Sequence, residues 1–155
     1  MITSFINRYL NRKKLYLSLI LSIILLPGFL TTASADDTTA AGPLDIDGNG
    51  QYDALTDGLL LLREMFGLTD TALISGALAP DATFTTGAEI TSEINGLGNS
   101  IDIDGNGSAD ALTDGLIILR YLFGLREDVL INGVIAPNAT LSDASDIGAK
   151  IRSLM

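Results

Sequence analysis

Large apolar residues recur at helical spacing in two stretches of this chain, and the second stretch copies the first. In the first stretch they occupy positions i, i+4, i+7 and i+11 from Leu55 to Phe66, and neighbouring apolar residues leave little polar face. This pattern predicts a helix over 54–66, with a copy over 111–123, that is buried on more than one side. A glycine and a leucine follow each final phenylalanine, which is typical of a helix end where the glycine is left-handed.

Gly58 and Gly115 stand inside these two predicted helices. Glycine in a helix interior costs about 1 kcal/mol relative to alanine, so its presence in both copies needs a reason. Close approach of another backbone is one explanation, and drift retained after a recent duplication is the other.

A second helix is predicted in each copy. Thr86 and Glu89 have the spacing of a capping box, and a narrow apolar stripe follows at Ile90, Ile94 and Leu97, with copies at 147, 151 and 154. Shorter helical segments are predicted at 70–75 and 127–132, before an Ala-Pro pair breaks the chain. No stretch alternates for long enough to predict a strand. We therefore expect an all-α protein of tandem duplicated loop-helix units with additional short helices.

The two copies form an internal repeat of 57 residues (102 minus 45). Shifting the chain by this length places 44–98 over 101–155 without a gap, and about half of the aligned positions are identical. Each repeat alone is near the size at which a hydrophobic core is marginal, so we expect one domain, packed about a pseudo-twofold axis. The chain has no cysteine, so bound metal rather than disulfides would add stability.

The same acidic loop opens both repeats, Asp-Ile-Asp-Gly-Asn-Gly at 45–50 and at 102–107. Alternating carboxylate and amide oxygens, with a glycine at position six for a sharp turn, suit Ca²⁺. The main-chain carbonyl at position seven would add a ligand, and the aspartate at position nine would bind directly or through water while capping the helix. Two calcium sites are predicted, with the ligands Asp45, Asp47, Asn49, Gln51, Asp53 and Asp57 in the first loop and Asp102, Asp104, Asn106, Ser108, Asp110 and Asp114 in the second.

The closing ligand is open in both loops. An EF-hand loop ends on a bidentate glutamate at position twelve, whereas this chain has Thr56 and Thr113 there, with Asp57 and Asp114 one residue later. Either the aspartate reaches the ion, since Asp53 and Asp57 are one helical turn apart, or the threonine hydroxyl or water completes the shell. Both arrangements favour a modest affinity, on the order of 10⁻⁴ to 10⁻³ M, as in extracellular modules.

Acidic glycine turns without an ion are the alternative interpretation, because Asp, Asn and Gly favour turns by themselves. That interpretation does not explain oxygen-bearing residues at four odd positions with glycine at position six, twice in one chain. Magnesium fits less well than calcium, because its octahedral shell takes fewer protein ligands.

The first 35 residues differ in kind from the repeats. Basic residues within 8–14 precede an apolar stretch over 15–26, and an Ala-Ser-Ala sequence ends at Ala35. This order is typical of a secretory signal peptide over 1–35, cleaved after Ala35 and followed by a short linker over 36–43. An uncleaved membrane anchor is the alternative, but the apolar run is shorter than the roughly 20 residues that a spanning helix needs. We expect a Sec-exported protein, periplasmic or secreted, without membrane contact in its mature form.

All 19 acidic residues lie after Ala35 with only 5 basic ones, so the mature chain has a net charge of −14 (5 minus 19). Nucleic acid and anionic membranes are poor partners for such a chain. There is no histidine or cysteine to act as a base or nucleophile, and the loops account for most carboxylates. An enzyme is therefore not expected.

The pattern Asp-x-Asp-Gly-Asn-Gly-x-x-Asp, followed by an apolar helix, resembles the loop-helix half of an EF-hand in the form found twice in type I dockerins. The loops are also similar to those of integrin-type propeller and thrombospondin type 3 repeats, which lack the long apolar helix. The dockerin resemblance implies that Asp45, Asp47, Asn49, Asp53 and their copies bind calcium. It also implies a calcium-dependent anchoring module with a cohesin-like or other surface protein as partner, in a context of polysaccharide degradation.

Two functional hypotheses of different classes follow. In one, calcium orders a duplicated face, including Leu60, Met65, Ile118 and Leu122, that docks a protein partner. In the other, the metal is structural and the chain is a stand-alone exported calcium-binding protein with no cohesin-type partner. Exposed apolar surface after folding favours the first hypothesis, and burial of both apolar stripes between the repeats favours the second.

Overall fold

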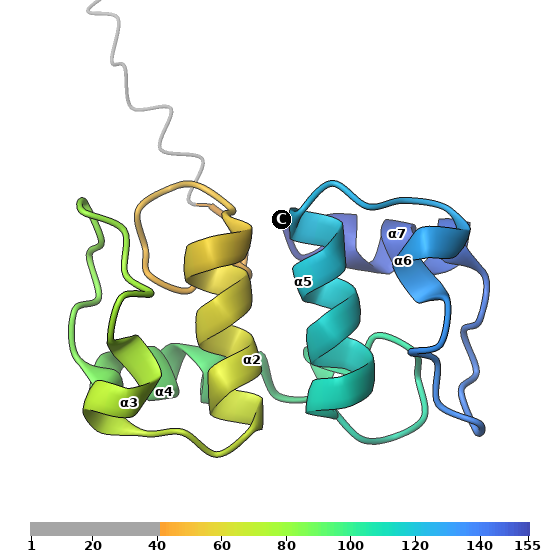
Figure 1. The fold of residues 1–155 in the computed structure, drawn as a ribbon, viewed down its shortest axis with the longest axis horizontal. Coiled ribbons are helices and arrows are strands. Elements are labelled where there is room, and N and C mark those ends of the chain that lie inside the picture. Colours follow the sequence, from red (N-terminus) through yellow and green to blue (C-terminus); the bar gives the residue numbers. More distant parts are fainter. Residues whose placement is uncertain (1–40) are drawn as a thin grey trace, which may run out of the picture. The chain divides into compact units, whose positions relative to one another are not determined.

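The described part of the computed structural model comprises residues 41–155, so the predicted signal peptide and most of the predicted linker lie outside it. Every regular element within 41–155 is a helix, and this confirms the all-α prediction (Figure 1). None of these helices is both long and apolar enough to traverse a bilayer. The elements are η1 (Ala54–Gly58), α2 (Leu59–Met65), α3 (Asp70–Ile74), α4 (Gly87–Leu97), η2 (Gly98–Ile101), η3 (Ala111–Gly115), α5 (Leu116–Leu122), α6 (Asp128–Ile131) and α7 (Ala144–Arg152).

Each loop-helix unit starts with a π-helical turn that continues directly into an α-helix. In η1 the Gly58 N–H donates to the Asp53 carbonyl, five residues earlier, at 3.1 Å, and η3 repeats this bond at the same distance. A π turn holds one residue more than an α turn. It therefore changes the direction in which the side chains before it face, relative to those of the α-helix that follows. The sequence predicted the helices but not their π-helical starts.

Because of this shift, the predicted apolar stripe is only partly the buried one. Leu55 and Phe66 are 65% and 54% exposed, and their copies in the second repeat are similarly exposed. Leu60 and Leu61 are fully buried instead. Leu55 lies in the π turn, out of phase with α2, and Phe66 lies at the C-cap, where the helix no longer fixes which way a side chain faces.

The ends of α2 and α5 have the predicted glycine caps. The Leu68 N–H donates to the Arg63 carbonyl at 3.0 Å and the Gly67 N–H to the Glu64 carbonyl at 2.6 Å, and Gly67 has φ of 77°. This is the Schellman arrangement, and it confirms the predicted helix ends. The second repeat has the same pair of bonds.

An arginine fastens the next short helix to α2. Arg63 Nη1 donates to the carbonyls of Leu73 and Ser75, both at 2.9 Å, at the C-terminal end of α3. These carbonyls have no partner inside so short a helix, so the guanidinium takes the place of a cap. Arg120 binds the end of α6 in the same way.

The second helix of each repeat is capped as the sequence predicts. At α4 the Thr86 side chain accepts from the Glu89 N–H, while the Glu89 carboxylate accepts from the Thr86 N–H, and this completes a capping box. At α7 the Asp143 carboxylate accepts from the Ser145 N–H at 2.7 Å. The apolar stripes of both helices then join one core with the loop-helix units.

The glycine at the end of each π turn lies at the contact between the repeats. A Cβ atom on Gly58 would lie 2.9 Å from Leu119 Cδ1 and 3.2 Å from Leu122 Cδ1. There is therefore little room for a side chain at position 58. A close approach explains the glycine, but the nearest atoms belong to leucine side chains of the opposite repeat and not, as the sequence predicted, to its backbone.

The contact between the repeats is reciprocal. A Cβ atom on Gly115 would lie 2.7 Å from Met65 Sδ and 3.1 Å from Leu62 Cδ1, which occupy the positions equivalent to the two leucines that cover Gly58. Such an exchange of equivalent residues is what a pseudo-twofold axis produces. Accordingly, α2 and α5 lie side by side and run in opposite directions (Figure 1).

The docking face predicted from the sequence is only partly exposed. Leu60 and Ile118 are fully buried. Met65 and Leu122 are half-buried and lie against the glycine of the opposite repeat. Leu60 and Ile118 are therefore not available to a partner, whereas Met65 and Leu122 contact the opposite repeat and keep part of their surface exposed.

Replacing Gly58 by valine should lower the free energy of unfolding by about 1–3 kcal/mol, because the new side chain must displace Leu119 and Leu122. Gly96 is the matched control, since nothing lies within 4 Å of a Cβ at that helical position. Gly96→Val should change the stability by no more than about 0.5 kcal/mol. Urea unfolding followed by circular dichroism measures both, and equal effects would contradict the close contact.

Candidate metal centre

Three aspartates converge at the acidic loop of each repeat. One carboxylate oxygen of each lies within 4.8 Å of the others, and the second and third aspartates of each group are buried. Each group can hold a metal ion, in agreement with the two predicted sites. The groups are Asp45, Asp47 and Asp57 in the first repeat and Asp102, Asp104 and Asp114 in the second.

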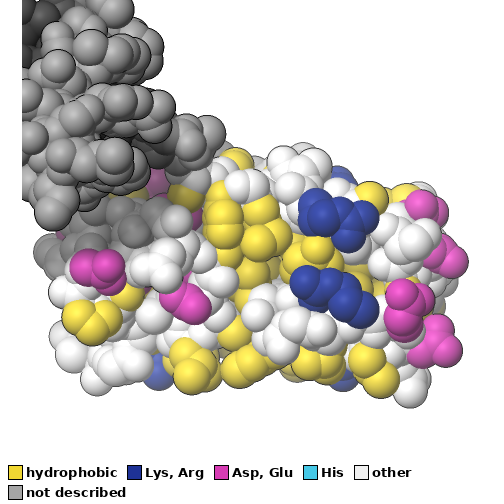
Figure 2. Space-filling model, turned by 90° about the horizontal axis from the view of Figure 1, so that it is seen from above, with side chains coloured by type: hydrophobic (Ala, Val, Ile, Leu, Met, Phe, Trp, Pro, Cys, Tyr) yellow, Lys and Arg dark blue, Asp and Glu magenta, His cyan; other side chains and the backbone are white. Residues whose placement is uncertain are grey.

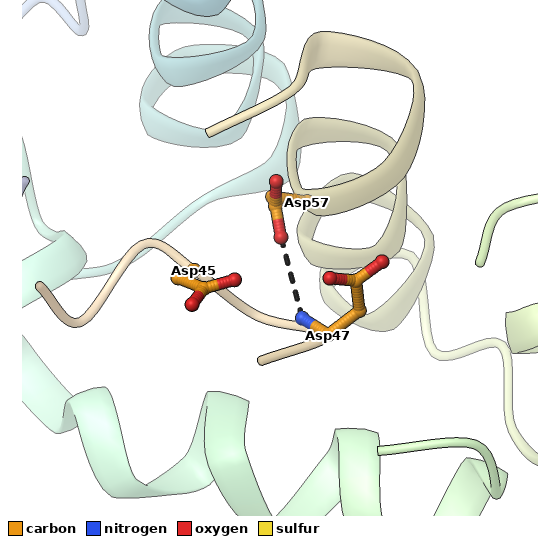
Figure 3. Close-up of side chains that lie close together, drawn as sticks. All are labelled: Asp45, Asp47 and Asp57. Carbon is orange, nitrogen blue, oxygen red and sulfur yellow. Dashed lines mark hydrogen bonds between the residues drawn. The ribbon is translucent and has the colours of Figure 1, made fainter. Parts of the chain in front are cut away.

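Asp57 is the third carboxylate of the first acidic group, and the backbone of the loop fixes it. Its Oδ1 accepts from the Asp47 N–H at 3.3 Å (Figure 3) and from the Ile46 N–H at 2.8 Å. Its Oδ2 accepts from the Asp53 N–H at 2.7 Å. The Thr56 hydroxyl donates to the same Oδ2 at 3.2 Å. The π turn therefore brings position thirteen to the loop, where an EF-hand has its position-twelve glutamate.

Asp45 and Asn49 shape the loop itself. Asp45 accepts from the N–H groups of Asn49 at 3.0 Å and Gly50 at 2.9 Å, and Asn49 Oδ1 accepts from the Gln51 N–H at 2.9 Å. Gly50 has φ of 84°, the left-handed conformation that the predicted sharp turn requires. The side-chain oxygens at positions one and five are thus held by the turn that carries them.

Residues 79–84 cover the loop, and we call them the wrapping segment. The sequence pattern predicted no role for them. The Ala79 N–H donates to Asp47 Oδ2 at 2.9 Å, and the N–H groups of Thr83 and Phe84 donate to the Asp47 carbonyl at 2.8 and 2.9 Å. The Thr83 hydroxyl donates to the Gly48 carbonyl at 2.6 Å. Asp47 is therefore bound through both its side chain and its main chain.

The second repeat reproduces these bonds. Asp114 accepts from the N–H groups of Ile103 at 2.6 Å, Asp104 at 3.0 Å and Asp110 at 2.9 Å. Its wrapping segment, 136–141, begins with an Ala136 N–H that donates to Asp104 Oδ2 at 2.9 Å. Both wrapping segments contain the same Ala-Pro and Ala-Thr pairs, and this identity was the available signal for their role.

Asp53 and Asp110, the predicted ligands at position nine, lie outside the two acidic groups. Both are exposed, and neither side chain makes a capping hydrogen bond, so the predicted capping role is wrong. The main-chain N–H of each instead donates to the closing aspartate one turn later. Their role as direct or water-mediated ligands stays a prediction, as do the position-seven carbonyls of Gln51 and Ser108.

Burial gives two of these carboxyls a raised pKa. For Asp57, burial raises the pKa and the Asp47 carboxylate adds to the rise, against N–H donors that lower it. For Asp104, burial again has the largest effect, and the carboxylates of Asp114 and Asp102 raise the pKa further. Each site thus crowds negative charge where solvent cannot screen it.

The donor set fits a hard divalent cation. Within the described residues, the hydrogen bonds to the six carboxylates come from main-chain N–H groups and threonine hydroxyls, with no ammonium or guanidinium among the donors. Main-chain dipoles orient the oxygens but leave their net charge uncompensated. A divalent ion coordinated by oxygen would supply that charge.

Comparison with known proteins found no match among family models, curated proteins or solved structures. The likeness to a loop-helix calcium module therefore rests on the residues of this chain. Two acidic groups and a helical fold are compatible with such a module.

Replacing Asp57 by asparagine should remove ion binding at the first site, because one of three converging charges is lost. Thr56→Val is the matched control next to it, and it should leave binding nearly unchanged, since Thr56 only donates to Asp57. Calorimetric titration with Ca²⁺ measures both variants. Loss of binding in the Thr56 variant alone would show that the threonine closes the site.

Ca²⁺ binding should weaken as the pH falls from about 7 to about 4, because bound metal requires ionised carboxylates. A carboxyl with a pKa raised above 3.8 takes up protons earlier than an ordinary aspartate, so the metal-free fold gains stability below the raised pKa. That stability is lost as the pH rises through the raised pKa, where the ion replaces the proton. Titrations across this range test the prediction, and a constant affinity down to pH about 4 would contradict it.

Proposed function

We propose that this chain is an exported calcium-binding module in which each ion fastens a helix to its loop and wrapping segment. The observation that carries the proposal is the position of Asp57 and Asp114. Each stands one residue beyond position twelve of its loop, and a π turn places its carboxylate beside the other two of its acidic group. The N–H groups that bind this third carboxylate orient it but do not neutralise its charge, which a bound cation would do. Calcium suits the predicted shell better than magnesium, because it accepts more protein oxygens in a flexible geometry.

The ion would act mainly on folding. Without it, the carboxylates of each site repel one another in a buried position, in a mature chain with a predicted net charge of −14. Two Ca²⁺ ions would reduce this charge to −10 (−14 plus 4). Metal that binds only the folded state stabilises that state by mass action. The chain has no cysteine, so such ions, and not disulfides, would cross-link and stabilise the folded state.

We also propose that the module binds a protein partner when calcium is present, as its resemblance to dockerins implies. Supporting this, Leu55, Phe66, Leu112 and Phe123 are all more than half exposed. Hydrophobic side chains gather in a band on one face of the molecule (Figure 2). Exposed apolar patches are typical of interaction surfaces. A cohesin-like partner and a polysaccharide-degrading context rest on the resemblance alone.

A stand-alone structural calcium protein is the second candidate function. The burial of Leu60 and Ile118 favours it, because these parts of the apolar stripes belong to the core and cannot meet a partner. The two candidates share the metal sites and differ only in whether the exposed apolar residues have a partner. Both are non-catalytic roles.

Calorimetric titration of the metal-stripped exported chain with Ca²⁺ should give two bound ions per chain, with a parallel rise in helix content. We expect dissociation constants on the order of 10⁻⁴ to 10⁻³ M. Mg²⁺ at the same concentrations should bind more weakly, because it dehydrates reluctantly and needs an octahedral site.

The control for this titration is the double variant Asp45→Ala with Asp102→Ala. It should bind no Ca²⁺, because each site loses its first ligand. Unchanged affinity in that variant would overturn the site assignment. No binding by the unmodified chain up to about 10 mM, well above the weak extracellular range, would mean that the loops are turns.

A further inference from the structure

We propose that the C-terminal end of α2 is a docking site for a basic segment of a partner protein, which inserts an arginine or lysine side chain beside Glu64. The proposal names a partner chemistry for the interaction function proposed above, so it rests on that function. The acidic residue at its centre, Glu64, belongs to the first repeat and has no acidic copy in the second.

A cavity of about 330 Å³ opens at this end of α2. The apolar residues Met65, Ile94 and Ile101 line it, and so do the polar residues Glu64 and Asn95. Apolar walls suit the aliphatic stem of a long basic side chain, and a carboxylate with an amide suits its charged head. The negative end of the α2 dipole adds to the attraction for a cation.

A second cavity, of about 690 Å³, shares Met65 with the first. Its apolar lining includes Phe66, which is 54% exposed, Leu112 and Ile135. Asn106 and Asp110 of the second acidic loop line it as well. Exposed apolar residues lie next to the acidic pocket. This arrangement fits a segment that carries an apolar side chain close to its basic one. The two cavities together define the partner as both basic and apolar.

The second repeat has different residues at the equivalent place. Tyr121 stands at the position of Glu64, and it is buried instead of lining an acidic hollow. Arg126 lies over the Tyr121 ring, 3.6 Å from its centroid, and Arg152, which replaces Asn95, donates to the Tyr121 hydroxyl at 3.4 Å. An aromatic ring covered by two arginines excludes a basic ligand. The acidic pocket is therefore a property of the first repeat.

Charge complementarity favours a basic occupant over an acidic or neutral one. The mature chain has a predicted net charge of −14, and a field of that sign steers cationic partners towards it. A second copy of the chain would have the same negative charge, so it is the less favoured source of the arginine. The observations thus indicate a separate, basic protein.

The test is an NMR titration of the calcium-loaded exported chain with the peptide acetyl-Leu-Gly-Arg-amide. Backbone signals of residues around the pocket, Gly67, Asn95 and Gly98, should shift on addition of the peptide. A peptide with neutral citrulline in place of arginine has the same shape and should bind about three- to fivefold more weakly, as expected for one ion pair at a partly exposed site.

Two variants with the same change of charge separate the pocket from the general field. Glu64→Gln should weaken binding of the arginine peptide by about three- to fivefold, whereas Glu93→Gln, an exposed residue that does not line the pocket, should change it less than about twofold. Equal effects of the two variants, or no shifts at the pocket, would overturn the proposal. Calcium titration of the same samples should still give two ions, so failure here is distinct from failure of the calcium function.

Sedimentation of the chain without peptide tests the other occupant. We expect a monomer at all concentrations. Self-association that Glu64→Gln abolishes would assign the pocket to an arginine of a second copy, and would overturn its assignment to a separate protein.

Discussion

One carboxylate at the first helical turn of each repeat holds the fold and the candidate metal centre together. Asp57 accepts hydrogen bonds from two N–H groups of the loop and from one at the start of the helix. It thereby sets the angle between loop and helix and adds a third charge to the acidic group. For the Asp57 carboxylate to reach the loop, the first turn must hold one residue more than an α-helical turn. The π-helical start provides this extra residue.

The wrapping segments make each site a product of its whole repeat. The loop occupies six residues, but its third residue is bound by main-chain N–H groups more than thirty positions later. Arg63 then ties the intervening short helix to α2. Loop, helix and wrapping segment therefore form one hydrogen-bonded unit, and order in the loop and order in the 79–84 segment depend on each other.

Local signals in the sequence predicted much of this structure. The capping box at Thr86, the glycine cap at Gly67 and the acidic loops depend on residues close in sequence, and the structure agrees with each. The close approach at Gly58 could be predicted because both repeats retain the glycine despite its cost. These features needed no knowledge of the tertiary fold.

What the sequence could not predict depends on contacts between distant residues. The π turn is set by where the Asp57 carboxylate must lie, so a regular helical period placed Leu55 on the buried side when it is exposed. The wrapping segment is held mostly by main-chain donors, so the recurring Ala-Pro and Ala-Thr pairs were its only sequence signal and did not show which loop it covers. Asp53 looked like a cap by its position, but its main-chain N–H is engaged by Asp57 and its side chain faces solvent.

The reciprocal contact at Gly58 and Gly115 also bears on the origin of the chain. One repeat carries both halves of that contact, the glycine and the pair of long side chains that cover it. Such a surface is self-complementary, so two separate single-repeat chains have the means to pair as an isologous homodimer. Fusion of the two copies replaces a dimer whose formation depends on concentration with packing inside one molecule. It also frees the two halves to diverge, as Glu64 and Tyr121 have done.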